Sequence, residues 1–307
     1  MDELTVLEYK YAYAGWYINP KNHQQIYSER KEFSNQRRAV DDYHLCGVYE
    51  KAKVPYEVHE ITGNEYAHLE PHEAIPLSVA DACKNAVEGN KKILISSGYC
   101  ALAPAIAGGI QQALEPEKRL GIIWIDAHSD NLIVEKTDSQ DIRFVGFPLS
   151  TIVGQTMDDW RKNFCRLERP CSGENVLISD ARCSDVESLS NLKDAGINLV
   201  SEDQFDDSVY WKKRVDELSR EVDAIFLMVD VDILKSEHIP AYFRKEPGGH
   251  DVDTVMNNIQ AVMETGKVLA FACFCVDFDK YEQGGDLTYL NSMRLIGAGL
   301  EAWAKQK

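Results

Sequence analysis

The sequence predicts an α/β fold in which a mainly parallel sheet carries helices on both faces. Short apolar, β-branched runs bounded by polar turns alternate with longer amphipathic stretches along most of the chain. A strand–helix–strand order at this spacing is typical of βαβ units, whose strands lie parallel. The strand segments are apolar almost throughout, as expected when helices cover both faces of the sheet.

Each element follows from its local pattern. The apolar runs predict the strands Lys92–Ser96, Leu120–Asp126, Val176–Ser179, Asn198–Val200, Ala224–Asp230 and Val268–Val276. The amphipathic segments predict the helices Glu73–Glu88, Ala101–Leu114, Asp185–Ala195, Val209–Glu221, Asp251–Glu264 and Leu287–Ala304. We interpret the polar stretch Lys21–Arg38 as loops and a surface helix around the first strand. Because no linker rich in Pro, Gly or Ser divides the chain, we expect one domain over residues 1–307.

Composition excludes several classes of partner. The chain has 50 acidic and 33 basic side chains and a formal charge of −17, which argues against nucleic acid and an anionic membrane surface. The N-terminus lacks a signal-peptide pattern, and the longest apolar runs are strand-sized. Eight cysteines are too few for a disulfide scaffold, and we expect Cys273 and Cys275 to act as small hydrophobic residues. We therefore expect a reduced, cytoplasmic protein with a small-molecule or protein partner.

Two predicted strands end in candidate metal ligands. Leu120–Asp126 leads into Asp126-Ala-His128-Ser-Asp130, and Ala224–Asp230 leads into Asp230-Val-Asp232. Residues two apart in an extended chain point the same way, so each set can converge on one cluster. Carboxylate and imidazole together suit Mn, Fe or Zn. The alternatives are a polar loop with Asp126 as a helix cap and an acidic strand end that simply reaches solvent.

A third strand end places Cys100 after Lys92–Ser96 and a Gly turn. A thiolate at this edge could bind a metal, and a nearby cation or helix N-terminus would lower its pKa. On position alone, a buried and inert cysteine is the commoner case.

These motifs resemble the arginase/agmatinase (ureohydrolase) family. Asp126-Ala-His-Ser-Asp130 is similar to the family's Asp-Ala-His-x-Asp signature, and Asp230-Val-Asp232 to its second acidic pair about 100 residues on. The resemblance covers residues 91–280 and implies a three-layer α/β/α fold with a central, mainly parallel sheet of about eight strands. It also implies two Mn²⁺ ions per chain, other divalent metals being possible, bridged by a hydroxide that attacks a guanidinium carbon. A homo-oligomer, trimeric or hexameric, is usual for the family.

The resemblance also implies roles for individual residues. Asp126 and Asp230 would bridge both metals, His128 and Asp232 would complete one, and Asp130 would serve the other. Cys100 stands where the family has a metal-ligand histidine, as in a branch that cleaves hydroxyguanidino compounds such as Nω-hydroxyarginine.

Other positions carry the candidate substrate contacts. Val145 stands where arginases have a histidine thought to transfer protons. Asp277 resembles a shorter replacement for the family's glutamate that pairs with the substrate guanidinium, and is a candidate catalytic and substrate-binding residue. His128 is a second candidate catalytic residue. Asp185, equally well placed as a helix N-cap, and Asn131 are candidate substrate-binding residues. His238 and His250, after the second acidic pair, are interpreted as surface residues.

Two functions from different classes follow. The first is a binuclear-manganese amidinohydrolase that releases urea or hydroxyurea. The second is a catalytically silent, arginase-like protein acting as a binding or structural subunit. A hydrolase for another amide or imine, such as formiminoglutamate, also stays open.

Overall fold

The computed structural model describes residues 3–9, 16–28, 43, 45–242, 244–275 and 285–306. Its centre is an eight-stranded sheet in the order β4-β1-β5-β11-β10-β6-β8-β9, and every neighbouring pair is parallel. The strands are β1 (Leu4–Glu8), β4 (Tyr56–Glu60), β5 (Lys92–Ile95), β6 (Leu120–Asp126), β8 (Val176–Asp180), β9 (Asn198–Val200), β10 (Ala224–Asp230) and β11 (Val268–Phe274). The predicted parallel sheet is confirmed.

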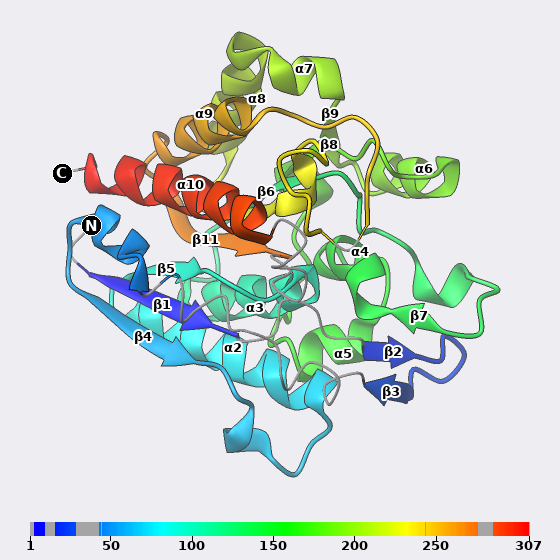
Figure 1. Ribbon diagram of the computed structural model, residues 1–307. Helices are drawn as coiled ribbons and strands as arrows, with labels where there is room; N and C mark the ends of the chain where they lie inside the picture. Colours follow the sequence, from blue (N-terminus) through cyan, green and yellow to red (C-terminus); the bar gives the residue numbers. More distant parts are fainter. Residues whose placement is uncertain are drawn as a thin grey trace.

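Helices cover both faces of this sheet (Figure 1). The α-helices are α2 (Pro71–Glu88), α3 (Ala103–Ala113), α4 (Pro148–Ile152), α5 (Asp158–Asn163), α6 (Val186–Asp194), α7 (Glu202–Asp206), α8 (Ser208–Glu221), α9 (Val252–Met263) and α10 (Gly285–Ala304). The 3-10 turns are η2 (Val48–Ala52), η3 (Asn64–Tyr66), η4 (Cys100–Leu102), η5 (Val134–Lys136), η6 (Phe144–Gly146), η7 (Gly173–Asn175) and η8 (Val231–Ile233). Helices α2 and α3 pack on one face, and α8, α9 and α10 on the other.

Strand β10 shows how the apolar runs build two core layers. Phe226 and Met228 point into the layer under α2 and α3, whereas Leu227 and Val229 point into the layer under α8 to α10. All seven residues of the strand are buried. This alternation between two apolar layers explains why the central strands lack the polar alternation of a half-exposed strand.

The N-terminal part departs from the prediction. Beyond β1, it supplies edge strand β4 and the strands β2 (Trp16–Ile18) and β3 (Gln25–Ser28). These two form a second, antiparallel sheet with β7 (Ile142–Arg143) in the order β3-β2-β7. The interpretation of Lys21–Arg38 as loops and a helix is wrong for Gln25–Ser28, and residues 29–38 lie outside the described residues. The strand was missed because it has four residues, of which only Ile26 and Tyr27 are apolar or aromatic, and so carries little periodic signal.

Helix boundaries follow capping chemistry. Helix α2 begins with a reciprocal capping box between Glu70 and Glu73 and has Pro71 at its first position. Asp207 caps α8 by accepting hydrogen bonds from the backbone N–H groups of Val209 and Tyr210. Among the residues that the structure describes, no helix combines the length and hydropathy needed to cross a membrane.

Close packing of α3 against α2 predicts that Gly109→Ala destabilises the fold. A β-carbon at Gly109 would lie 2.2 Å from the Ala80 carbonyl oxygen and 2.7 Å from the Cys83 β-carbon. This clash should outweigh the gain in helix propensity and lower the free energy of unfolding by about 1–3 kcal/mol, measured by denaturant titration. Gly146→Ala is the control, because a β-carbon there meets nothing within 4 Å. Equal stabilities of the two variants would contradict this packing.

Candidate metal centre

The sheet register brings the two predicted acidic strand ends together. Strands β6 and β10 are neighbours, and Ile125 pairs with Val229. The next residues, Asp126 and Asp230, therefore leave the carboxyl edge of the sheet side by side. The following turn η8 carries Asp232 to the same edge, and its backbone N–H donates to Asp230 Oδ1 at 3.0 Å.

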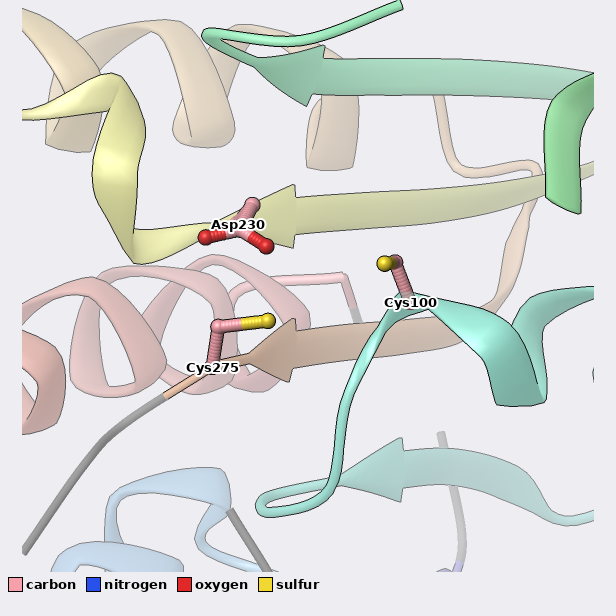
Figure 2. A group of neighbouring side chains, drawn as sticks. All are labelled: Cys100, Asp230 and Cys275. Carbon is pink, nitrogen blue, oxygen red and sulfur yellow. The ribbon is translucent and has the colours of Figure 1, made fainter. Parts of the chain in front are cut away.

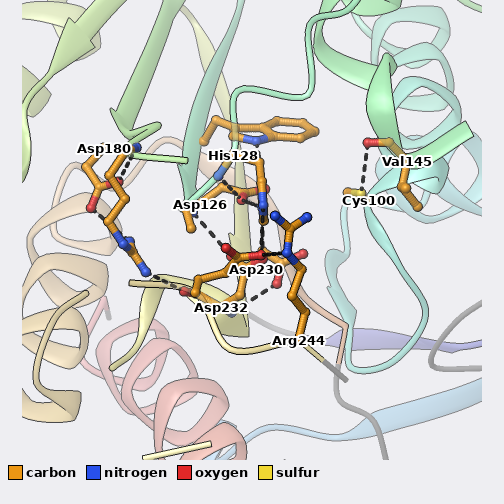
Figure 3. A network of polar contacts seen from close by, with 12 residues as sticks. Cys100, Asp126, His128, Val145, Asp180, Asp230, Asp232 and Arg244 are labelled. Carbon is orange, nitrogen blue, oxygen red and sulfur yellow. Dashed lines mark hydrogen bonds and ion pairs between the residues drawn. The ribbon is translucent and has the colours of Figure 1, made fainter. Parts of the chain in front are cut away.

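Asp126, His128 and Asp232 form what we call the imidazole cluster, whose ligand atoms all lie within 4.8 Å of one another. His128 Nδ1 lies 3.0 Å from Asp232 Oδ2 and 3.5 Å from Asp126 Oδ1 (Figure 3). Backbone N–H groups hold the carboxylates: Ala127 donates to Asp232 Oδ1 at 3.2 Å, and His128 to Asp126 Oδ1 at 2.7 Å. Three of the predicted metal ligands are thus brought together.

Burial controls the protonation of this cluster. Asp126 and Asp232 are each 1% exposed, and Asp230 is 3% exposed. Burial, followed by the Asp232 charge, raises the pKa of both Asp126 and Asp230 well above the ordinary value. Burial would also raise the pKa of Asp232, but the hydrogen bond and charge of His128 lower it. Burial alone would lower the pKa of His128, yet its hydrogen bonds to Asp126 and Asp232 raise it. A cation here would relieve the repulsion among three buried carboxyl groups.

The second cluster contains Cys100, Asp230 and Cys275, again with ligand atoms within 4.8 Å of one another; we call it the thiol cluster (Figure 2). Burial raises the pKa of the Cys100 thiol, and raises that of Cys275 to about 12 against the opposing effect of its hydrogen bond with Cys100. Asp130 interacts with Cys100, and burial raises its pKa to about 7. Asp130 adopts φ 45° and belongs to none of the clusters found among the described residues.

Cys275 packs against both core layers, as expected of a small hydrophobic residue, and it also belongs to the thiol cluster. Cys273 lies fully buried in the layer under α8 to α10. Strand β11 ends at Phe274, and Cys275, with φ 65°, turns toward the ligand edge while still touching both core layers. The predicted strand Val268–Val276 placed Cys275 inside the strand, so its position after the end of β11 became visible only in the structure.

A third group, His128, Cys183 and Glu246, lies beside the imidazole cluster; we call it the outer cluster. His128 Nε2 is 3.3 Å from Glu246 Oε1, which is also 2.9 Å from the Nε atom of Arg244. The Glu246 side chain is 4% exposed, whereas that of Arg244 is 65% exposed. Burial and a hydrogen bond with Glu246 raise the pKa of Cys183 to about 11. The sequence prediction missed Glu246, because nothing in its loop marks an isolated glutamate as buried.

The donor sets allow a test of the divalent metals that the resemblance implies. The imidazole cluster offers two buried carboxylates and one imidazole, a combination that suits Mn²⁺ and other borderline divalent ions. The residues therefore fit a metal at the edge formed by β6 and β10.

Comparison with known proteins supports the family resemblance seen in the sequence motifs. The family model described as "Arginase family" matches residues 22–288. The chain belongs to the arginase family. An arginase of Staphylococcus aureus is 26% identical over 168 residues, which cover 53% of each chain, so the match spans about half the length of that relative. A formimidoylglutamase of Citrobacter koseri is 24% identical over 209 residues, 68% of this chain and 60% of the relative.

Solved structures of arginases share the fold. The Entamoeba histolytica arginase, in complex with L-ornithine, superposes with a TM-score of 0.77 and 16% identity over 98% of both chains. The Bacillus caldovelox arginase gives a TM-score of 0.75 and 16% identity, also over 98% of both chains. At these identities the likeness establishes the three-layer architecture, and this predicted fold is confirmed.

Two of the departures from the arginase-family pattern, both within the described residues, lie next to each other. Cys100 and Val145 stand where the resemblance predicts histidines, and the Cys100 thiol donates to the Val145 carbonyl oxygen at 3.7 Å (Figure 3). The edge of the site between η4 and η6 therefore presents a thiol beside a backbone carbonyl in place of two imidazoles.

The predicted substrate-binding residues Asn131 and Asp185 converge on Ser188. Asn131 Nδ2 donates to the Ser188 carbonyl oxygen at 2.8 Å, and the Ser188 N–H donates to Asp185 Oδ1 at 2.7 Å. Asp185 thus caps α6, and hydrogen bonds with Ser188 lower its pKa. Asn131 is buried, with 1% exposure. Asp277, the third such residue, lies outside the described residues.

His250 is not the surface residue expected. Its side chain is fully buried, with Nε2 2.7 Å from Asp180 Oδ2 and Nδ1 2.7 Å from Asp206 Oδ1. Arg182 also pairs with Asp180, at 3.0 Å, and its Nη2 donates to the Asp232 carbonyl oxygen at 2.7 Å. The interpretation was wrong for His250 because the partners that bury it come from β8 and α7, far away in sequence. His238 is partly exposed, at 28%.

The His250 contacts predict a pH-dependent loss of stability in His250→Gln. Burial lowers the pKa of His250, but hydrogen bonds with Asp180 and Asp206 raise it above the ordinary value. A raised pKa stabilises the fold fully below the unfolded value of about 6.5, and this stabilisation is lost as the pH rises through the folded value. We expect a loss of about 1–3 kcal/mol at low pH that shrinks as the pH rises, measured by denaturant titration.

The control for this series is His238→Gln, which should change stability little at any pH. A deficit of His250→Gln that grows between pH about 6 and about 9 would contradict the stated sign.

Proposed function

We propose that this arginase-family protein is a metal-dependent amidinohydrolase that cleaves a guanidino or hydroxyguanidino C–N bond and releases urea or hydroxyurea. The observation that carries the proposal is the convergence of Asp126, His128 and Asp232 with Asp230 at adjacent strand ends. Such a set of buried carboxylates costs free energy without a cation, and its retention favours a working metal site.

The ligands are assigned by cluster. Asp126, His128 and Asp232 would hold one divalent ion, for which Mn²⁺ is the proposed metal. Asp230, with Cys100 and Asp130, would serve a second, and Asp126 and Asp230 are the proposed bridging residues. Bound divalent cations acidify water and neutralise negative charge that develops on a reacting group.

The chain also offers a carboxylate for a cationic substrate. Glu246 is buried next to His128, and it already pairs with the planar guanidinium of Arg244. A carboxylate can make paired hydrogen bonds to such a group, so Glu246 suits a substrate guanidinium in place of Arg244. His128, between Glu246 and Asp232, is the proposed catalytic residue among those described; Asp277 keeps its proposed catalytic and guanidinium-binding role. Asn131 and Asp185 remain proposed substrate contacts at the start of α6.

A catalytically silent binding protein is the second candidate. The observation that favours it is the pair Cys100 and Val145, since both stand where the resemblance predicts imidazoles that bind metal or move protons. Val145 supplies no imidazole for proton transfer in turn η6. A hydroxyguanidino substrate needs less help of this kind, because its leaving group is less basic than an alkylamine.

The trimer or hexamer expected from the resemblance stays a prediction.

The proposal predicts metal-dependent urea release that Asp230→Asn abolishes. After loading with Mn²⁺ and Zn²⁺ and desalting, mass spectrometry should find about two divalent ions per chain in total. In Asp230→Asn, at most about one should remain, and urea or hydroxyurea release should fall more than about a hundredfold, because a neutral amide is a weaker ligand than a carboxylate. The substrates to screen are arginine, hydroxyarginine, agmatine and guanidinobutyrate.

Asp203→Asn, on the exposed surface of α7, is the matched control and should keep both metal and activity. Absence of any bound metal from the unmodified chain would overturn the hydrolase assignment. Bound metal without release from any of these substrates would favour the silent protein.

The proposed contact between Glu246 and the substrate guanidinium predicts a binding defect in Glu246→Gln. Loss of a charged hydrogen bond should raise KM for the guanidino substrate by roughly 10- to 100-fold, with a smaller effect on kcat. Steady-state kinetics measures both parameters. Glu237→Gln, at an exposed position, is the control. An unchanged KM would show that Glu246 does not contact the substrate cation.

A further inference from the structure

Three side chains from three neighbouring strands meet in the thiol cluster. In the sheet order β5-β11-β10, Cys100 begins the turn after β5, Cys275 follows the end of β11, and Asp230 ends β10. Their sulfur and oxygen atoms lie within 4.8 Å of one another. Figure 2 shows Asp230 at the end of β10, Cys275 just beyond the end of β11, and Cys100 at the start of the helical turn that follows the loop after β5.

The backbone holds the two cysteines in this arrangement. The Cys275 N–H donates to the Gly98 carbonyl oxygen at 2.9 Å, which joins the end of β11 to the loop that carries Cys100. Gly98 has φ 103° and Cys275 has φ 65°. A positive φ costs free energy in a residue with a β-carbon, so the surrounding structure maintains this turn at Cys275.

The donor atoms differ in chemical type from those of the imidazole cluster. Two sulfurs and one carboxylate form a soft set, whereas Asp126, His128 and Asp232 offer oxygen and nitrogen. Thiolates select Zn²⁺ over Mn²⁺, which prefers oxygen ligands. In a tetrahedral Zn²⁺ site, two sulfurs bound at about 2.3 Å lie about 3.8 Å from each other. The Cys100 and Cys275 sulfurs lie within 4.8 Å of each other, so binding one ion requires them to move together by up to about 1 Å.

We propose that Cys275 is a metal ligand together with Cys100 and Asp230, and that these three residues form a thiolate site that takes Zn²⁺ in preference to Mn²⁺. This inference rests on the proposed function, because it takes Asp230 as a metal ligand. It adds Cys275 to the proposed ligand set. The two metal sites would then differ in donor type, with soft sulfur donors between β5 and β10 and harder oxygen and nitrogen donors at β6.

Cobalt(II) provides the test, because its thiolate bonds absorb in the near ultraviolet with an intensity that follows the number of sulfur ligands. Metal-free protein, kept reduced with a phosphine, is titrated with Co²⁺ alone. We expect a charge-transfer band in the unmodified chain that falls about twofold in both Cys100→Ala and Cys275→Ala. Cys273→Ala is the matched control, since Cys273 lies two residues away but outside the cluster, and its band should equal that of the unmodified chain.

A second measurement needs no variant. X-ray absorption of the unmodified chain loaded with one equivalent of Zn²⁺ should show two sulfur neighbours at about 2.3 Å. Competition between equal amounts of Zn²⁺ and Mn²⁺ should leave Zn²⁺ bound at this site, and Cys275→Ala should reduce the Zn²⁺ retained.

The outcomes separate this inference from the proposed function. An unchanged band in Cys275→Ala, or one sulfur neighbour or none around Zn²⁺, overturns the ligand role of Cys275, even if metal-dependent urea release persists. A chain that binds neither Co²⁺ nor Zn²⁺ overturns both proposals. Two sulfur neighbours without urea release support the thiolate site and overturn only the hydrolase.

Discussion

The free energy of burying several carboxyl groups at one sheet edge constrains the rest of this structure. Asp126, Asp230 and Asp232 are almost completely removed from water, and each raises the cost of ionising its neighbours. The protein offsets part of this free energy, because His128 and two backbone N–H groups contact the Asp126 and Asp232 carboxylates. A divalent cation is the remaining compensation that suits this chemistry.

The surrounding architecture keeps those carboxylates in place. Arg182 joins Asp180 to the Asp232 backbone and donates to the Pro247 carbonyl oxygen, and His250 continues the network to Asp206 on α7. These contacts couple the end of β8, the turn after β10 and the loop that carries Glu246. Second-layer contacts of this kind orient ligands and tune the metals they hold.

The departures from the arginase-family pattern are concentrated on one side of the centre. Among the described residues, Cys100 and Val145 both lie on the side facing β5 and η6, whereas the imidazole cluster contains residues of the two motifs that resemble those of the family. A change of metal or of substrate at one half of a binuclear centre would produce this distribution, and so would partial loss of function. Metal binding by the thiol cluster would distinguish these explanations, because a change of metal keeps a metal site there, whereas a loss of function does not require one.

The sequence alone determined the parallel sheet, the main helices and the candidate metal ligands that follow strand ends. Strands such as β6 and β10 were predictable because their apolar runs are local signals, and Asp126 and Asp230 stand out as charges that end those runs. The short polar strand β3 and the edge strand β4 were not predictable, because their stability comes from pairing with distant strands. Only the tertiary structure places Cys275, Glu246 and His250 beside the candidate metal ligands or the residues that contact them. The positions of these residues depend on the order of strands in the sheet and on contacts between loops at its edge. The pattern of apolar residues along the sequence does not indicate which strands become neighbours.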